Sequence, residues 1–399
     1  MRHRKTGAFV ALLATLTAVL AVIAASASAA SSSPIVIGWA FDSKGGMAPF
    51  DGPALAAAQI RVKAVNAKGG VRGRPMKIIT CDTQGNKPAI AKACAAKLLG
   101  QGADIIFTTC DVDLAAPVVQ EAINRGVLAV APCIGTDQMG PKRFGSKGRL
   151  AFTFGNVAQD EGSAMADYAW AKGWRNASLA TDTVIVYFKN VVQAFEARWK
   201  QLGGKIVADE TYQSAPAGGG NAASWQAVTT RLNNEKADVI VTATAPPWGA
   251  LPTIMNGLRA LGNETPFLNS WAGDGTYWVS KDQPTVNYYF VTYASVFGDD
   301  PVPAVNRLAK QVKAGTGGFI TGPAAIDGVA TAIRRAKSTR GIALAAQLEK
   351  FRKVPTLSGL VSFTPQLHSV FGRRYRVILI QDNQAKVVGT VVAKVVPKI

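Results

Sequence analysis

The chain has 399 residues, 48% of them hydrophobic, and 44 Lys and Arg against 25 Asp and Glu give a net charge of +19. A chain of this length exceeds one ordinary hydrophobic core, so we expect two domains. The basic residues occur singly or in short pairs such as Arg334-Arg335, without a basic helix or an aromatic RNA-binding motif, so we expect no nucleic-acid partner. We interpret the charge as a solvated basic surface that faces an anionic envelope.

Residues 1–29 have the pattern of a secretory signal peptide. Arg2, Arg4 and Lys5 precede an apolar stretch, and the stretch ends in the small residues Ala27-Ser28-Ala29. The apolar stretch is long enough to compete as a membrane anchor, because about 18 residues nearly span a bilayer. Its alanine content and its end favour cleavage, and no later segment predicts a span. We therefore expect an exported protein in the periplasm or the extracytoplasmic cell envelope.

After this segment, short apolar runs alternate with stretches of helical spacing. In the first half the predicted strands are 34–38, 76–80, 104–108 and 127–130, and the predicted helices are 52–67, one opened by Pro88, and 114–125. The pattern restarts over 156–290, with strand material at 178–186, strands at 205–207, 238–242 and 266–268, and helices at 190–202, 224–235 and 251–261. The tail adds a strand at 288–293, helices at 303–314 and 324–337, and β-rich segments at 361–363 and 375–380. This alternation predicts an α/β fold of parallel sheets with helices on both faces.

Six loops follow the carboxyl ends of predicted strands, where open α/β sheets bind ligands and helix N-termini offer N–H groups. They are 42–50, 110–113, 131–136, 182–188, 243–248 and 269–277. The last three contain the aromatic residues Tyr187, Trp248, Trp271 and Tyr277. We expect these loops to line a cleft. Each aromatic residue has an alternative role in ordinary packing, and Asp111 has one as a helix N-cap.

Four cysteines, Cys81, Cys94, Cys110 and Cys133, lie in one short region, and an even number in an exported chain predicts disulfides. Cys110 and Cys133 end neighbouring predicted strands, close enough for a bridge in the wall of the cleft. Cys81 and Cys94 would then join a strand end to the following helix. The spacing alone leaves all three pairings open. There is no Cys-x-x-Cys, and His368 is the only histidine after the predicted signal, so we expect no metal site and no cofactor.

Several segments resemble the periplasmic leucine/isoleucine/valine-binding proteins, the type I substrate-binding proteins of ABC transporters. The segments are Ile35-Val-Ile-Gly-Trp-Ala, Ala64-Val-Asn-Ala-Lys-Gly-Gly-Val-Arg-Gly-Arg-Pro, Cys81-Asp-Thr-Gln, Gly126-Val-Leu-Ala-Val-Ala-Pro, Asp160-Glu-Gly and Trp199-Lys-Gln-Leu-Gly-Gly-Lys-Ile-Val. The resemblance covers essentially the whole chain after residue 29, and the Asn-Ala-Lys-Gly-Gly phrase is its most specific part.

The resemblance implies two Rossmann-like lobes joined by three hinge crossovers, near Phe154-Gly155, Val291-Thr292 and Phe363-Thr364. The N-terminal lobe would then comprise 30–154 plus 292–363, and the C-terminal lobe 155–291 plus 364–399. It also implies a monomer that closes on a small ligand and delivers it to an ABC transporter permease. Some members have a disulfide that corresponds to Cys81 with Cys110, which is a further alternative for the pairing.

The family's ligand positions correspond to Phe50, Asp111, Ile134 to Thr136, Tyr187 and the neighbourhood of Trp271 to Asp274. Together with the cleft loops, this gives the predicted ligand-binding residues Phe50, Asp111, Cys133, Ile134, Gly135, Thr136, Tyr187, Trp248, Trp271 and Asp274. Asp111 departs from the family's Ser or Thr, and a carboxylate cannot donate a hydrogen bond to a ligand carboxylate. Either Asp111 only caps a helix, or the ligand presents a donor or a positive group. We expect an amino acid or a related small polar or amino-bearing ligand.

Two other function classes remain alternatives. A secreted hydrolase could use paired carboxylates such as Asp111 and Asp113, but the sequence has no Gly-x-Ser-x-Gly elbow and no Gly-x-Gly-x-x-Gly after a strand. A single histidine after the signal also leaves no obvious Ser-His or Cys-His pair. A ligand-sensing receptor would share the fold, although no downstream membrane or kinase segment accompanies it. We therefore expect a binding protein and not an enzyme.

Overall fold

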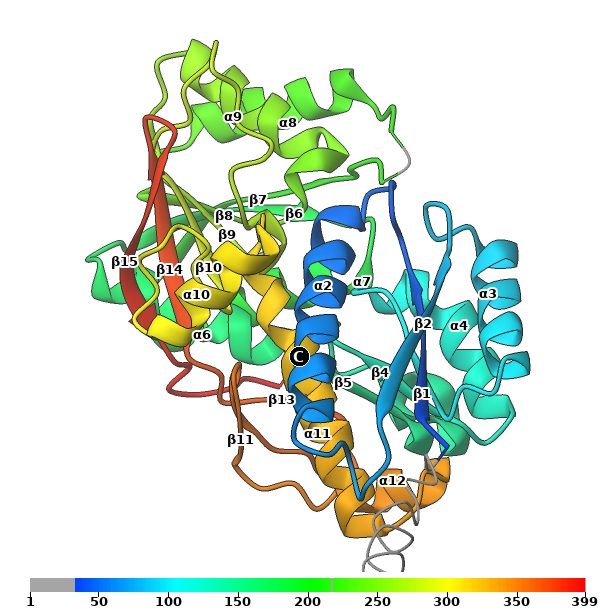
Figure 1. The fold of residues 1–399 in the computed structure, drawn as a ribbon. Coiled ribbons are helices and arrows are strands. Elements are labelled where there is room, and N and C mark those ends of the chain that lie inside the picture. The colour runs from blue at the N-terminus through cyan, green and yellow to red at the C-terminus, as the bar shows by residue number, and fades with distance from the viewer. Residues whose placement is uncertain (1–32, 217, 399) are drawn as a thin grey trace, which may run out of the picture.

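The computed structural model describes residues 33–216 and 218–398, so the predicted signal peptide lies outside the described residues. Two sheets, each covered by helices on both faces, form two lobes (Figure 1). Over the described ranges, none of the helices combines the length and the apolar character needed to cross a bilayer.

The sheet of the first lobe has six strands in the order β13-β5-β4-β3-β1-β2, and all neighbouring strands are parallel. The strands are β1 (Ile35–Phe41), β2 (Met76–Asp82), β3 (Ile105–Phe107), β4 (Leu128–Ala131), β5 (Ala151–Asn156) and β13 (Ser369–Val370). One face is covered by α2 (Ala48–Asn66) and α11 (Thr321–Ala336), and the other by α3 (Pro88–Gly100) and α4 (Val112–Asn124) (Figure 1). The lobe also contains α5 (Pro141–Phe144), α12 (Gly341–Leu348) and the hairpin of β11 (Val354–Thr356) and β12 (Gly359–Val361).

The sheet of the second lobe has seven strands in the order β15-β14-β10-β9-β8-β6-β7. Five are parallel: β6 (Asn176–Asp182), β7 (Lys205–Tyr212), β8 (Val239–Ala243), β9 (Phe267–Asn269) and β10 (Tyr288–Thr292). Two antiparallel strands complete one edge: β14 (Tyr375–Gln381) and β15 (Gln384–Val391). The covering helices are α6 (Ala158–Ala171) and α7 (Val186–Gln201) on one face, and α8 (Ala222–Asn234) and α9 (Ala250–Ala260) on the other, with α10 (Pro303–Val312) after β10.

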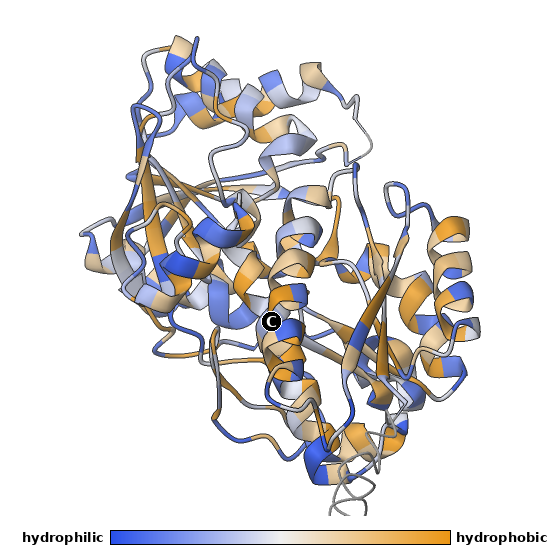
Figure 2. Cartoon of the chain, viewed as in Figure 1, coloured by the Kyte–Doolittle hydropathy of each residue, from blue (hydrophilic) through white to orange (hydrophobic). Residues whose placement is uncertain are grey.

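The core follows from the predicted apolar runs. Every residue of β4 and of β8 is buried, as expected for parallel strands covered on both faces. In Figure 2 the central strands are hydrophobic, while many helices carry hydrophilic residues along one side. The predicted α/β alternation is confirmed, and its departures have local physical causes.

Helix α2 begins at Ala48, four residues before the predicted start at Gly52, and contains Pro53 in its interior. Proline has no N–H group, so it leaves the carbonyl of the residue four positions earlier without its helical partner. That carbonyl belongs to Pro49, and the Thr316 hydroxyl donates to it at 3.0 Å. A distant residue therefore permits the extra turn, and the extra turn carries Phe50.

Helix α7 also begins four residues early, at Val186, where the sequence predicts strand material up to residue 186. The strand ends instead at Asp182. The backbone N–H of Val186 donates to Asp113 Oδ2 at 2.9 Å. A first-lobe carboxylate therefore satisfies a free N–H group at the start of this second-lobe helix.

The chain passes between the sheets after β5, after β10 and after β13. β13 pairs with β5, so the chain remains with the first sheet beyond the predicted crossover at Phe363-Thr364. The residue ranges of the lobes otherwise stay a prediction.

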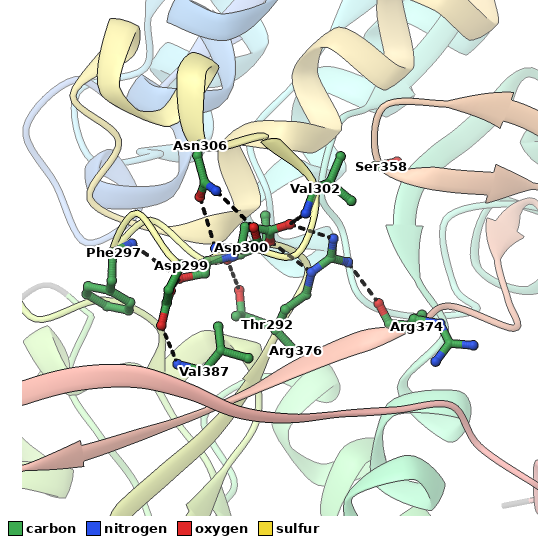
Figure 3. A network of polar contacts seen from close by, with 12 residues as sticks. Thr292, Phe297, Asp299, Asp300, Val302, Asn306, Ser358, Arg374, Arg376 and Val387 are labelled. Atoms are coloured by element: carbon green, nitrogen blue, oxygen red, sulfur yellow. Dashed lines mark hydrogen bonds and ion pairs between the residues drawn. The ribbon is translucent and has the colours of Figure 1, made fainter. Parts of the chain in front are cut away.

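Two of these passages are joined by an ion pair, shown in Figure 3. Arg376 donates through Nε and Nη2 to both carboxylate oxygens of Asp300, at 2.9 and 3.0 Å. Asp300 also accepts from the backbone of Ser295 and Val302, and its own backbone is held by Asn306. The segment after β10 is thereby fixed to the start of β14.

Candidate ligand-binding cavity between the lobes

A cavity lies where the two lobes meet at the carboxyl ends of their strands. First-lobe residues line one wall: Met47, Phe50, Cys110, Asp111, Cys133 and Gly135. Second-lobe residues line the other: Ile185, Tyr187, Phe188, Ala245, Trp248, Trp271 and Ala272. The space left between these side chains is about 20 Å³, which is room for about one water molecule. All these residues except the helix residues Phe50, Tyr187 and Phe188 lie in loops or single turns after strands, as the sequence predicts.

Aromatic rings from both lobes are in contact across the cavity. Phe50 and Trp271 stack with ring centroids 5.0 Å apart and planes 21° apart. Tyr187 lies 6.2 Å from Trp271, and Phe188 lies 5.3 Å from Trp248. Offset-stacked and tilted rings at these separations contribute about 0.5–1.5 kcal/mol per pair beyond their buried area. These rings make the cavity predominantly apolar.

Asp111 caps α4 and also lines the cavity, so the predicted cap is confirmed and the predicted ligand contact stays a prediction. Its Oδ1 accepts from the backbone N–H groups of Asp113 at 2.9 Å and Leu114 at 3.1 Å. Its side chain is nearly fully buried, and burial raises the pKa of this carboxyl to about 7. Oδ1 therefore serves the fold, and the carboxyl group itself remains part of the cavity wall.

The disulfides are Cys81–Cys94 and Cys110–Cys133. This confirms the predicted pairing in which Cys110 and Cys133 join neighbouring strand ends and Cys81 and Cys94 join a strand end to the following helix. The Cys110–Cys133 bridge joins the loops after β3 and β4, and both of its residues line the cavity. Asp51, in α2, connects this wall to the loop after β1. Its carboxylate accepts from the backbone N–H groups of Cys110 at 3.0 Å and Asp42 at 2.9 Å, and burial raises its pKa to about 7.

Glu161 is the main polar residue that the sequence analysis did not place in the site. It is fully buried in α6 and accepts from the Tyr187 hydroxyl at 2.8 Å, the Trp271 backbone N–H at 2.6 Å and the Asn156 amide at 2.6 Å. Burial raises its pKa to about 7. Glu161 therefore holds two of the cavity's aromatic residues in place. Its only signal in the sequence is the Asp160-Glu-Gly segment.

Four residues of the predicted cleft loops lie outside the cavity lining: Ile134, Thr136, Tyr277 and Asp274. Ile134 and Thr136 are buried behind it, and their carbonyls accept from the hydroxyls of Thr153 and Ser369. Tyr277 is exposed.

Asp274 is buried as well, and its Oδ2 accepts from the Thr292 hydroxyl at 2.6 Å and the Gly317 backbone at 2.5 Å. Gly317 lies beside α2 in the first lobe. Asp274 therefore fastens the lobes together and does not line the cavity. The predicted ligand contact of this residue stays a prediction.

Two further polar contacts cross between the lobes at the rim of the cavity. Asp113 accepts from Val186 and pairs with Arg143 at 2.6 Å, so both of its carboxylate oxygens have partners, and it does not line the cavity. The indole N–H of Trp248 donates to the Gly46 carbonyl at 3.4 Å. A Cβ at Gly46 would lie only 2.5 Å from this indole nitrogen, so glycine is required for the approach. With Asp113 committed in this way, the cavity does not present a pair of carboxylates.

The sequence pattern of the periplasmic binding proteins matches residues 34–385. The chain belongs to the periplasmic binding protein family. Among curated relatives, the Leu/Ile/Val-binding protein BraC3 of Rhizobium johnstonii is 24% identical over 338 residues, which covers 79% of this chain and 86% of the relative.

Solved structures of this periplasmic binding protein's relatives have the same type I fold. The branched-chain amino acid transporter substrate-binding protein LivJ of Streptococcus pneumoniae, in complex with isoleucine, is 20% identical with a TM-score of 0.74, covering 90% of this chain and 99% of its own. The leucine-binding protein LivK of Thermotoga maritima is 17% identical with a TM-score of 0.74, covering 90% and 98%. At these identities the likeness shows the fold.

Proposed function

We propose that this periplasmic binding protein is an exported, monomeric solute-binding protein that captures an amino acid or a related small amino-bearing molecule between its lobes. It then delivers the ligand to the permease of an ABC transporter. The observation that carries the proposal is the cavity itself, in which rings from both lobes surround one buried carboxyl group. One relative is named as a Leu/Ile/Val-binding protein and another was solved in complex with isoleucine, which supports the amino-bearing class.

The dimensions of the cavity make lobe movement part of the mechanism. A space of about 20 Å³ cannot hold an amino acid, so a ligand enters only when the rings of Phe50 and Trp271 separate. The first lobe, with Asp111, would receive the ligand, and the second lobe would close over it with Tyr187 and Trp271. The three passages between the sheets would absorb the rotation, as hinges do in two-lobed proteins. A ligand polar group left unmatched after closure costs about 1–3 kcal/mol, which is the source of selectivity.

A thermal-shift screen of the purified protein tests this proposal, with amino acids, amines, carboxylic acids, amides and sugars as probes. A ligand present at about 100 times its Kd adds roughly 2.7 kcal/mol of stability, which raises the Tm measurably. We expect at least one amino-bearing solute to raise the Tm and to leave the chain unconverted. A receptor would bind in the same cavity, so stimulation of a reconstituted permease separates the two functions. The proposal is wrong if no solute of any class changes the Tm.

Intrinsic fluorescence localises the binding. Trp271 lies in the cavity, so the emission change on binding should disappear in Trp271→Phe. Trp170→Phe is the matched control, because Trp170 packs against Trp199 near the C-terminal ends of α6 and α7, whereas Tyr187 and Phe188 line the cavity from the start of α7. The emission change should persist in this control.

A further inference from the structure

The charge of the cavity lining is one-sided. Asp111 is its only charged side chain, and no Lys, Arg or His lines the cavity within 33–216 and 218–398. A ligand carboxylate placed there would meet no positive side chain, and Asp111 would repel it whenever the Asp111 carboxyl is ionised.

The side-chain hydrogen-bond donors of the cavity are largely occupied. The first N–H groups of α4, which could hold an anion, are taken by Asp111 itself. The Tyr187 hydroxyl donates to Glu161, and the Trp248 indole donates to Gly46. The Trp271 indole N–H is the remaining unpartnered side-chain donor of the lining. By contrast, Asp111 Oδ2 receives no hydrogen bond from any part of the chain that the structure describes.

The apolar walls add an attraction for cations. The rings of Phe50, Tyr187, Phe188, Trp248 and Trp271 surround the same small space as Asp111. Aromatic faces attract ammonium groups, with about 2 kcal/mol or more where the cation is desolvated. Burial and the neighbouring Asp113 raise the pKa of the Asp111 carboxyl, and the two backbone N–H groups and the Arg143 charge offset this only in part. A cation in the cavity would supply the missing partner.

We propose that the cavity selects its ligand through an ammonium group, and that the ligand does not need a carboxylate. The ligand class is an alkyl or arylalkyl amine whose cationic end faces Asp111 Oδ2 and whose apolar part lies among the rings. This inference rests on the proposed solute-binding function and narrows it, because an ordinary amino acid would bring an unmatched negative charge into the cavity.

Matched pairs of probes that differ only in the carboxylate test the inference. Leucine is compared with 3-methylbutylamine, phenylalanine with 2-phenylethylamine, and 4-methylpentanoic acid serves as the probe without an amine, all by thermal shift and calorimetry. We expect each amine to bind at least tenfold more tightly than its amino acid, and the acid not to bind. Tighter binding of leucine than of 3-methylbutylamine, or binding of the acid or a sugar alone, overturns the inference and leaves the solute-binding function intact. Failure of every probe class overturns both.

The variant Asp111→Asn separates the charge from the helix cap, because asparagine caps helices about as well as aspartate. We expect the affinity for 3-methylbutylamine to fall at least tenfold while the Tm without ligand stays within a few degrees. Asp104→Asn is the matched control. Asp104 lies just before β3, at the end opposite the cavity, where it accepts from the Val36 backbone at 2.9 Å. The control should keep its affinity, and unchanged affinity in Asp111→Asn would overturn the inference.

Discussion

The two disulfides offer a matched comparison of stability against site order. Cys110→Ala/Cys133→Ala removes the bridge in the cavity wall, and Cys81→Ala/Cys94→Ala removes the bridge between β2 and α3. Both bridges lie in the first lobe, and only the first one lines the cavity. We expect the two double variants to lose similar stability but to differ in the order of the cavity loops.

The expected losses follow from the lengths of the closed loops. The sequence separations are 23 residues for Cys110–Cys133 and 13 residues for Cys81–Cys94. The chain-entropy relation then gives about 3.4 and about 2.9 kcal/mol of unfolding free energy, a difference of only about 0.5 kcal/mol. A general loss of stability should therefore be nearly equal in the two variants, and a local effect on the cavity should not.

Hydrogen exchange followed by mass spectrometry measures the local effect, and urea denaturation measures the global one. In the Cys110/Cys133 variant we expect faster exchange over 108–114 and 132–137, together with weaker binding of any ligand that the screen identifies. In the Cys81/Cys94 variant those segments should exchange as in the unchanged protein. Equal exchange in both variants, after correction for their measured stabilities, would refute the reasoning that this bridge holds the cavity wall.

Three further predictions concern groups outside the cavity lining. Asp113→Ala removes the contact to the Val186 N–H, so the lobes should separate more readily, with a larger radius of gyration in solution scattering and a weaker affinity. Arg376→Ala leaves the Asp300 carboxylate buried without its cation, and urea denaturation should show a loss of about 3–5 kcal/mol. Burial raises the pKa of Glu161 from 4.5 to about 7, so the folded state retains a proton that the unfolded chain releases. The free energy of unfolding should therefore fall as pH rises through that window, and less steeply in Glu161→Gln.

Each of these has a control within the chain. Glu196→Ala removes an exposed i,i+4 pair with Lys200 within α7, which joins no two lobes, so it should leave the radius and the affinity unchanged. Arg374→Ala removes an exposed neighbour of Arg376 and should cost less than about 1 kcal/mol. An identical pH slope in Glu161→Gln and the unchanged protein would contradict the role given to that carboxyl group.

Most of the fold could be predicted because its strands are short continuous apolar runs and most of its helices have one apolar face. Two of the elements that were not predicted, α6 and β15, lack the hydrophobic pattern by which the others were identified. Helix α6 contains Asp160, Glu161 and Asp167, all buried, so its sequence does not show the polar face that marks a surface helix. The edge strand β15 is half exposed along its whole length and lacks the apolar run that identified the inner strands.

The first-lobe wall of the cavity could be predicted from loop positions alone, since Phe50, Asp111 and Cys133 all lie at predicted strand ends or loops. The hydrogen bonds of Glu161 to the cavity's aromatic residues, and the contact by which Asp274 joins the lobes, could not be predicted in this way. Glu161 reaches the cavity through hydrogen bonds from Tyr187 and Trp271, which are distant in the sequence. Such partners are set by tertiary packing, and a lone acidic residue within a helix is normally exposed.

Two kinds of contact hold the lobes together, and they should affect ligand binding in opposite directions. The contacts of Asp113 with Val186 and of Asp274 with Gly317 lie outside the cavity lining, so they can persist when a ligand is enclosed. The stack of Phe50 on Trp271 occupies the cavity, so an entering ligand must displace it. A ligand gains affinity only from interactions that differ between the competing conformations. These two contacts outside the lining therefore preorganise closure around the ligand, whereas the ring stack competes with it. Selectivity then depends on how well the ligand replaces that stack.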